Sequence, residues 1–137
     1  MSEDDKNFVF VEIIGAARMK FNQKHFNDPI FDTKIFNIAD QIMVGYNGGY
    51  WNYLEWKGLP IFSLECDTKL VLRNPHSGGE YVMDKILAGI IITIYTCSFY
   101  IEMGDDRMAE YIHKLTDLAY SYAEELGEFD AAYKMLD

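Results

Sequence analysis

The residues of this chain best suited to chemistry are its three histidines, its two cysteines and a loop in which His76 and Ser77 precede two glycines. A histidine beside a hydroxyl could orient a nucleophile. However, the loop has neither the Gly-x-Ser-x-Gly elbow of hydrolases nor a phosphate-binding lysine. His25, His76 and His113 are far apart and lack the HxxxH or HExxH spacing of metal sites. The pattern favours a polar turn, and a small enzyme centred on His76 and Ser77 is the alternative.

The remaining reactive groups indicate no catalysis either. Asp105 and Asp106 are adjacent, so their carboxylates diverge and cannot share a proton as a hydrolase pair does. Cys66 and Cys97 fall on a predicted strand and a predicted buried helix, without a CxxC or Cys/His cluster, and are interpreted as small buried apolar residues. The chain begins without the basic-then-apolar order of a secretion signal. We therefore predict a cytoplasmic protein with no catalytic residue, metal site or cofactor.

Negative charge is concentrated near the end of the chain. The net charge is −10, and residues 102–137 contain ten acidic residues against three basic ones. Nucleic acid phosphates repel such a protein, so direct DNA or RNA binding is not expected, and a basic protein surface is the favoured partner. Glu110, Asp117 and Glu124 recur every seven residues, about 10.5 Å apart along a helix. That line is too sparse to imitate a row of phosphates by itself, and a solvated helix face is the simpler interpretation.

Aromatic residues are dense in the run from Tyr46 to Tyr53, where two glycines precede an extended segment. Glycines tolerate the positive φ of a tight turn. In the strand that follows, Tyr50 and Asn52 point to one face and Trp51 and Tyr53 to the other. Single-stranded bases could stack on such rings, but the surrounding lysines or arginines that track a backbone are absent. Core packing is favoured, and Trp56 is the first candidate for an exposed protein-binding aromatic.

The helices and strands that position these residues can be predicted from the apolar periodicity of the sequence and from its turn residues. We predict four helices: one over 28–43 behind an Asn27 or Asp28 cap, a central one over 86–101 capped by Asp84, an amphipathic one from Met108 ending at Gly127, and a last one over 129–136. We predict strands near 50–57, 60–65 and 68–73, with a fourth edge strand at 80–82. The apolar run 86–101 is too short and too mixed for a membrane span. The fold class is α+β: a small antiparallel meander packed on a buried central helix with flanking amphipathic helices.

The motif Tyr46-Asn47-Gly48-Gly49-Tyr50-Trp51 resembles the signature of the ArdB/KlcA antirestriction family, small proteins of plasmids and other mobile elements. The Ala88-Gly89-Ile90 element of the central helix and the acidic end extend the resemblance over residues 17–137. The chain differs from the family pattern after Tyr53, where Lys57-Gly58-Leu59-Pro60 replaces an Asn-Gly-Gly-aromatic turn. The signature residues are Tyr46, Gly48, Gly49, Tyr50 and Trp51.

This resemblance implies a protein that relieves cleavage of unmodified DNA by type I restriction-modification enzymes, through contact with the enzyme or an associated host protein. An acidic interaction or immunity-like module with another protein partner is the alternative. The candidate partner-binding residues are Glu110, Asp117, Glu124, Glu125 and Trp56. Residues 1–137 are predicted to form one domain. We leave open whether residues 1–16 form a loosely attached N-terminal segment.

Overall fold

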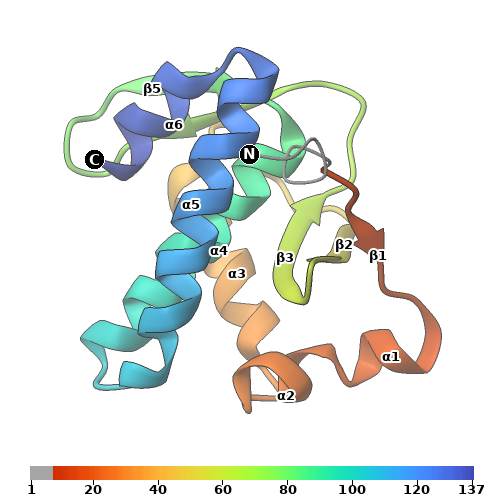
Figure 1. Cartoon of the computed structure of the whole chain (residues 1–137). Coiled ribbons are helices and arrows are strands. Elements are labelled where there is room, and N and C mark those ends of the chain that lie inside the picture. Colours follow the sequence, from red (N-terminus) through yellow and green to blue (C-terminus); the bar gives the residue numbers. More distant parts are fainter. Residues whose placement is uncertain (1–7) are drawn as a thin grey trace.

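The computed structural model describes residues 8–137 and has an α+β fold, as predicted (Figure 1). Its elements in chain order are β1 (Val11–Glu12), α1 (Gly15–Met19), α2 (Phe21–Phe26), α3 (Phe31–Ile42), β2 (Trp51–Trp56), β3 (Leu59–Leu64), β4 (Leu70–Arg73), β5 (Glu80–Met83), α4 (Lys85–Glu102), the 3-10 helix η2 (Asp106–Met108), α5 (Ala109–Leu126) and α6 (Phe129–Leu136). In Figure 1 the strands β1, β2 and β3 lie on one side of α4 and α5, and α6 lies beside β5 at the top.

Helix α4 is the centre of the fold. Its first backbone N–H groups are satisfied by the Asp84 carboxylate, which accepts from Ile86 and Leu87 as the predicted N-cap. Ten of its 18 residues are buried, so the helix is apolar around most of its circumference. By length and composition alone α4 could also cross a membrane, and more than half of it is buried inside this fold. The core therefore forms around α4, with β3 and α5 as its principal neighbours.

Two separate antiparallel sheets replace the single meander that the sequence predicted. The first has the order β1-β2-β3, and the second consists of β4 and β5. Strand β4 does not join β3 because α4 covers the free edge of β3. A Cβ placed on Gly89 would lie 2.1 Å from the Phe62 carbonyl oxygen, so only glycine permits this approach. The Phe62 N–H also faces the helix, where Thr93 Oγ1 accepts it at 3.4 Å.

The second sheet is continued by the end of α3. Met43 forms a bridge with Leu72, and the Val44 N–H donates to the Val71 carbonyl at 2.9 Å. Helix α3 itself begins at Phe31, slightly later than predicted, because Asp28 Oδ1 accepts the Ile30 N–H in the turn that precedes the helix. It ends before Gly45, as predicted. Gly127 adopts the left-handed conformation at the end of α5, which confirms the predicted C-cap.

The N-terminal part of the described chain carries two short helices that the sequence analysis did not predict, α1 and α2. Phe21 and Phe26 of α2 are buried, and the Phe26 and Phe31 rings stack with centroids 3.5 Å apart. Before α1, strand β1 pairs with β2, and the Phe8 and Phe10 rings pack against Tyr122 of α5. Residues 8–26 thus contact the sheet, α3 and α5.

Candidate functional site

The signature loop before β2 is closed by its own side chains. Trp51 is buried, and its Nε1–H donates to the Tyr46 hydroxyl at 3.1 Å. Gly48 and Gly49 both have positive φ, and a Cβ on Gly49 would lie 2.9 Å from Leu64 Cδ1. These two glycines therefore let the chain reverse so that Tyr46 can reach Trp51. We call this contact between Tyr46 and Trp51, which holds the loop closed at the start of β2, the clip.

The alternation predicted for residues 50–53 is present, and Leu54 on the other face is buried as well. Trp51 and Tyr53 are buried, whereas Tyr50 is 56% exposed. The guanidinium of Arg18 lies over both the Tyr53 ring, at 3.9 Å, and the Tyr50 ring, at 4.8 Å. The exposed tyrosine of the motif thus contacts a cation from α1. This contact joins two segments that lie 32 positions apart in the sequence.

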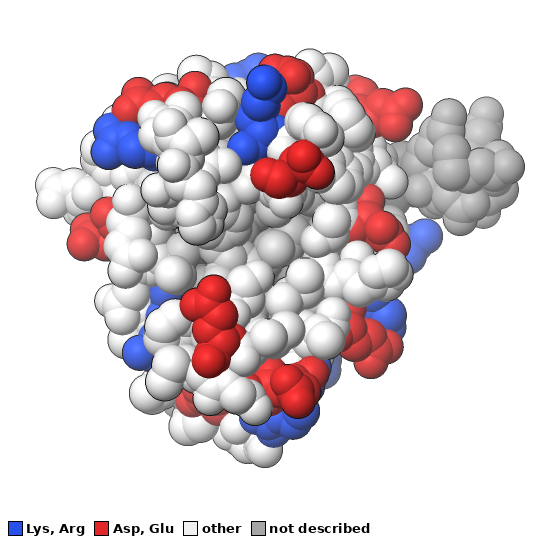
Figure 2. All heavy atoms as spheres, turned by 90° about the vertical axis from the view of Figure 1, so that its left-hand side faces the viewer, with Lys and Arg blue, Asp and Glu red and all other residues white. Residues whose placement is uncertain are grey.

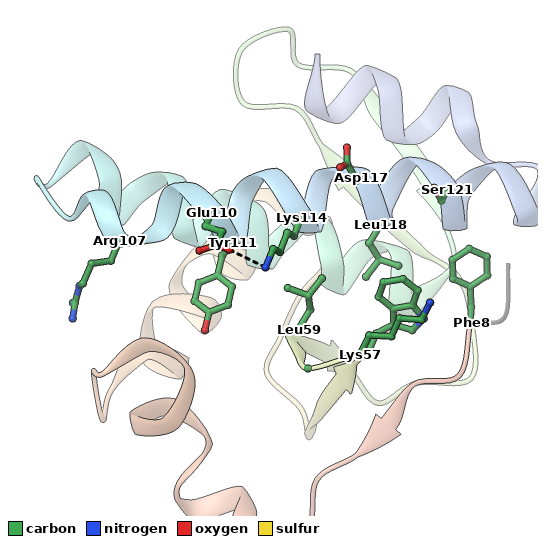
Figure 3. Close-up of a pocket in the computed structure, with 12 residues that line it drawn as sticks. Phe8, Lys57, Leu59, Arg107, Glu110, Tyr111, Lys114, Asp117, Leu118 and Ser121 are labelled. Atoms are coloured by element: carbon green, nitrogen blue, oxygen red, sulfur yellow. Dashed lines mark ion pairs between the residues drawn. The ribbon is translucent and has the colours of Figure 1, made fainter. Parts of the chain in front are cut away.

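A groove lies at the other end of β2, between the β2–β3 turn and helix α5 (Figure 3). It encloses about 700 Å³. Its lining combines apolar and aromatic residues with charges of both signs: Phe8, Trp56, Lys57, Gly58, Leu59, Arg107, Glu110, Tyr111, Lys114, Asp117, Leu118 and Ser121. A concave surface with an aromatic base and a charged rim is suited to receiving a side chain or peptide segment of another protein.

The charged groups of the groove are arranged in local pairs. Lys114 Nζ lies 2.8 Å from Glu110 Oε1, the i,i+4 pair that the helix spacing predicts, and this bond lowers the pKa of Glu110. Asp117 lies 3.7 Å from His113 on the same helix. Lys57 Nζ lies 4.7 Å from the centre of the Trp56 ring. Because these pairs are solvent-exposed, they can exchange for a partner's charges at little cost.

Three of the five predicted partner-binding residues meet at this groove: Trp56, Glu110 and Asp117. Glu124 and Glu125 lie further along α5, are exposed, and do not line it. Phe8, Lys57 and Lys114 were not predicted as site residues from the sequence. Phe8 could not be placed because its position depends on β1 crossing to β2. Tyr111 and Leu118 fall on the amphipathic helix predicted from Met108 to Gly127, and the sequence assigned no site role to these two positions.

Acidic side chains are dispersed over the surface that Figure 2 displays, with uncharged surface between them. Several acids of the C-terminal region also have structural contacts. Glu128 accepts the Asp84 N–H through one oxygen and pairs with Lys69 through the other, at 2.7 Å. Asp105 binds Arg107 and caps η2. The acids on α5 that face solvent are therefore better candidates for partner contact than the whole acidic region.

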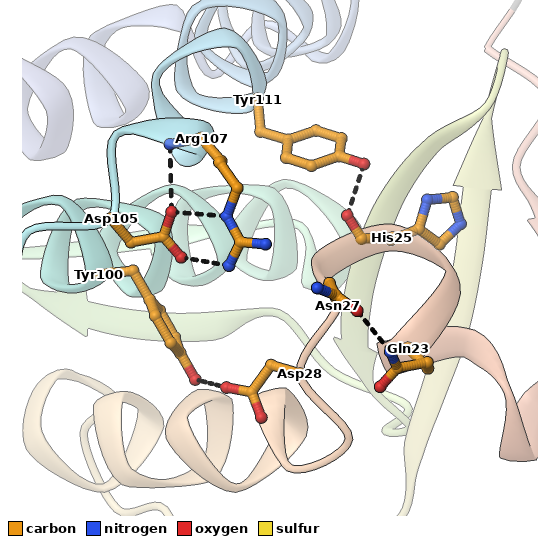
Figure 4. A network of polar contacts seen from close by, with 8 residues as sticks. All are labelled: Gln23, His25, Asn27, Asp28, Tyr100, Asp105, Arg107 and Tyr111. Atoms are coloured by element: carbon orange, nitrogen blue, oxygen red, sulfur yellow. Dashed lines mark hydrogen bonds and ion pairs between the residues drawn. The ribbon is translucent and has the colours of Figure 1, made fainter.

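Polar contacts join α2 and the segment after it to α4 and α5 (Figure 4). The Tyr111 hydroxyl donates to the His25 carbonyl at 2.7 Å, and the Tyr100 hydroxyl donates to Asp28. Burial, aided by that bond to Asp28, raises the pKa of Tyr100. Tyr111 belongs both to this network and to the groove wall. The network thus fixes one side of the groove against the N-terminal helices.

His25 is buried beside β2, with 6% of its side chain exposed. Its Nε2 lies 2.6 Å from Glu55 Oε2, and Lys24 contacts the same carboxylate at 3.0 Å. Burial lowers the pKa of His25 despite the nearby carboxylate. For Glu55, burial is outweighed by the hydrogen bonds from His25 and Lys24, so its pKa is lowered. A neutral imidazole therefore donates to an ionised Glu55.

The His76–Ser77 loop is an open turn. Both residues are exposed, and the Asn74 side chain accepts their backbone N–H groups at 2.8 and 3.3 Å. The Ser77 hydroxyl accepts the Gly79 N–H, so it is engaged in the turn itself. Neither residue lines the groove beside α5. This geometry gives no support to an enzyme centred on the loop.

The cysteines differ from each other. Cys97 is buried in α4, where burial raises the pKa of its thiol to about 12. Cys66 lies in the loop after β3, not on a strand as predicted, because β3 ends at Leu64. It is only partly buried, and its thiol donates to the Thr68 carbonyl. Within residues 8–137 no cluster of three or more His, Cys, Asp or Glu side chains is arranged to hold a metal ion.

Comparison with known proteins gives a result for structure and none for sequence. No protein-family model matches the chain, and no curated protein matches it. A solved structure of the KlcA and ArdB proteins superposes with a TM-score of 0.74, covering 90% of this chain and 94% of that one. This chain has the fold of KlcA and ArdB.

The likeness to KlcA and ArdB holds at 19% sequence identity, so it concerns the fold. The work on that structure describes a novel fold and antirestriction activity against type I DNA restriction systems in vivo but not in vitro. The fold predicted from the Tyr46–Trp51 resemblance is thereby confirmed. In this chain the residues of that motif form the clip at the start of β2, whereas the groove lies at the opposite end of the strand.

Proposed function

We propose that this chain is an antirestriction protein that relieves cleavage of unmodified incoming DNA by type I restriction-modification enzymes. The observation that carries the proposal is the match over 90% of the chain to the fold of KlcA and ArdB, which act against such systems. The protein acts in the cytoplasm by contact with another protein and without catalysis. The His76–Ser77 turn is exposed and its backbone is tied to the Asn74 side chain, and this open geometry supports that mechanism.

The proposed contact surface is the groove together with the exposed acidic face of α5. Trp56 supplies a large aromatic surface and has few rotatable bonds that must be fixed on binding. Glu110 and Asp117 lie on the α5 side of the groove. Glu124 and Glu125 continue the negative face beyond the groove. A basic and apolar segment of the restriction enzyme, or of a host protein associated with it, would be complementary to this surface.

The experiment is the plating efficiency of unmodified phage on a type I restricting host, with and without the protein, beside a non-restricting host. Because KlcA and ArdB are active in vivo but not in vitro, the assay belongs in cells. Recovery confined to the restricting host is the expected result. No recovery from a soluble protein would contradict the proposal and would favour an interaction module with a different partner.

The acidic face is tested by a fourfold variant that neutralises Glu110, Asp117, Glu124 and Glu125. We expect recovery of plating to fall at least tenfold, because long-range attraction to a basic surface is lost. A matched control neutralises four exposed acids elsewhere: Asp40, Asp67, Glu102 and Asp130. Both variants change the net charge equally. Equal recovery by the two variants would show that position on α5 is unimportant and would contradict the proposed surface.

A further inference from the structure

The outer edge of β1 has no strand beside it among residues 8–137. The first sheet has the order β1-β2-β3, and α4 covers the edge of β3, so in the described part of the chain β1 forms the uncovered side of this sheet (Figure 1). The Ile13 N–H donates inward to the Tyr53 carbonyl at 2.8 Å. By antiparallel alternation, the backbone groups of Phe10 and Glu12 therefore point outward. Such an edge is a template for another strand.

The sequence of this edge favours pairing. Residues 8–14 read Phe-Val-Phe-Val-Glu-Ile-Ile, which are β-branched or aromatic apart from one glutamate. Val9 is 60% exposed and Val11 is 55% exposed, on the face opposite the inward-packed Phe8 and Phe10. Ile14 is also exposed. The segment contains no lysine or proline, the residues with which natural edge strands commonly block further pairing.

We propose that this edge binds a second copy of the same chain, with β1 pairing antiparallel to β1 of the other copy about a twofold axis at Val11. The two three-stranded sheets then join into one sheet of six strands. A twofold axis is the symmetry by which one surface can be complementary to itself. This interface uses the outer edge of the sheet and shares only Phe8 with the groove. It does not depend on the proposed antirestriction activity.

Charge and apolar pattern select the register. With the axis at Val11, that residue faces its own copy, Val9 faces the partner's Ile13, and Glu12 faces the partner's Phe10. An axis one position later would place the two Glu12 carboxylates directly opposite each other, which is destabilising. Residues 8–27 carry one acidic residue against three basic ones, so the acid excess of the chain is not carried by this segment.

The size of the contact predicts a reversible dimer. Strand β1 itself spans only Val11–Glu12, and even pairing along the whole of residues 8–14 buries less than the roughly 1,200 Å² of a standard stable interface. Association should therefore depend on protein concentration in the micromolar to millimolar range. Backbone hydrogen bonds supply the specificity, and the valines supply the buried apolar area.

The first experiment is disulfide trapping in a Cys66→Ser background, which removes the partly exposed native thiol. In the proposed register Val11 and its copy form a non-hydrogen-bonded pair with Cα atoms about 4.5 Å apart, which a disulfide can bridge. Under mild oxidation Val11→Cys should form a covalent dimer at least tenfold faster than either control. The controls are Val9→Cys, which faces Ile13 instead of itself, and Val82→Cys, which is 58% exposed on β5.

The second experiment is sedimentation velocity over a concentration series. The wild-type protein should shift toward a dimer as concentration rises, Val11→Lys should lose that shift, and Val82→Lys should keep it. A wild-type protein that stays monomeric throughout, or a dimer that persists in Val11→Lys, would overturn the proposal. Trapping of Val9→Cys or Val82→Cys as fast as Val11→Cys would overturn the register and the edge, respectively.

Discussion

The two ends of strand β2 are both rich in aromatic residues, yet they have different roles. At the first end Trp51 is buried and hydrogen-bonded to Tyr46 within the signature loop. At the other end Trp56 is partly buried and lines an open groove beside α5. The conspicuous motif thus supports the fold, while the surface that we propose for a partner begins five residues later. A recognisable motif and a binding site need not coincide.

The largest expected effect is the loss of stability on replacing Trp51 with alanine. The side chain is buried against Phe36 and Tyr46, with ring centroids 5.7 and 6.0 Å away. Removing it should lower the free energy of unfolding by about 3–5 kcal/mol, because the cavity cannot fully collapse. Urea denaturation measures this loss. A loss as small as that of Trp56→Ala would show that the two ends do not differ as we describe.

Trp56→Ala should lower the free energy of unfolding less, by roughly 2 kcal/mol, because part of the ring is already exposed. Its effect on plating recovery should be larger than its effect on stability implies, since the ring belongs to the proposed contact surface. The measurement compares recovery in cells with the amount of folded protein. Full recovery at normal protein levels would exclude Trp56 from the contact.

Tyr46→Phe tests the hydrogen bond between Tyr46 and Trp51 and keeps the aromatic ring at position 46. The substitution removes the acceptor for the Trp51 Nε1–H, and a buried donor left without a partner costs about 1 kcal/mol or more. The matched control is Tyr50→Phe in the same loop, where the ring is exposed and no change in stability is expected. Thermal unfolding compares the two. An equal response would mean that the Tyr46–Trp51 bond does not hold the loop.

The smallest effect expected is a pH dependence from His25, whose partner Glu55 precedes Trp56. The pKa of His25 lies below its ordinary 6.5 in the folded protein, so the unfolded chain binds the proton first as pH falls. Stability should therefore decrease from about pH 6.5 downward. The lowered pKa of Glu55 adds a further loss below its ordinary 4.5.

The His25 contribution is measured by denaturant unfolding between pH 7.5 and 5, a range chosen around the ordinary histidine value. His25→Gln should flatten the dependence, although its stability at pH 7.5 will differ. His113→Gln is the control, because His113 is highly exposed on α5 and should leave the slope unchanged. If His113→Gln flattened the slope instead, the effect would belong to the surface of α5 and not to the side chain beside β2.

Much of the fold could be predicted from local signals in the sequence. The Asp84 cap, the buried helix that follows it, the Gly127 cap and the last helix are correct because capping and periodicity act within a few residues. Helices α1 and α2 were missed because they are short and stabilised by tertiary burial of Phe21 and Phe26. The division into two sheets was missed because it depends on α4 covering β3.

By itself the sequence determined the α+β class, the capped central helix and the alternation that buries Trp51 and Tyr53, since each depends on neighbouring residues. It also placed Glu110, Asp117 and Trp56 among the candidate contact residues. Only the tertiary structure decided that these three share one groove, that the signature loop closes on itself, and that no strand within residues 8–137 pairs with the outer edge of β1. The groove joins segments distant in sequence, and the state of the β1 edge depends on which edge another element covers. The Tyr46–Trp51 contact spans only five positions, and it depends on how the glycine turn between them folds.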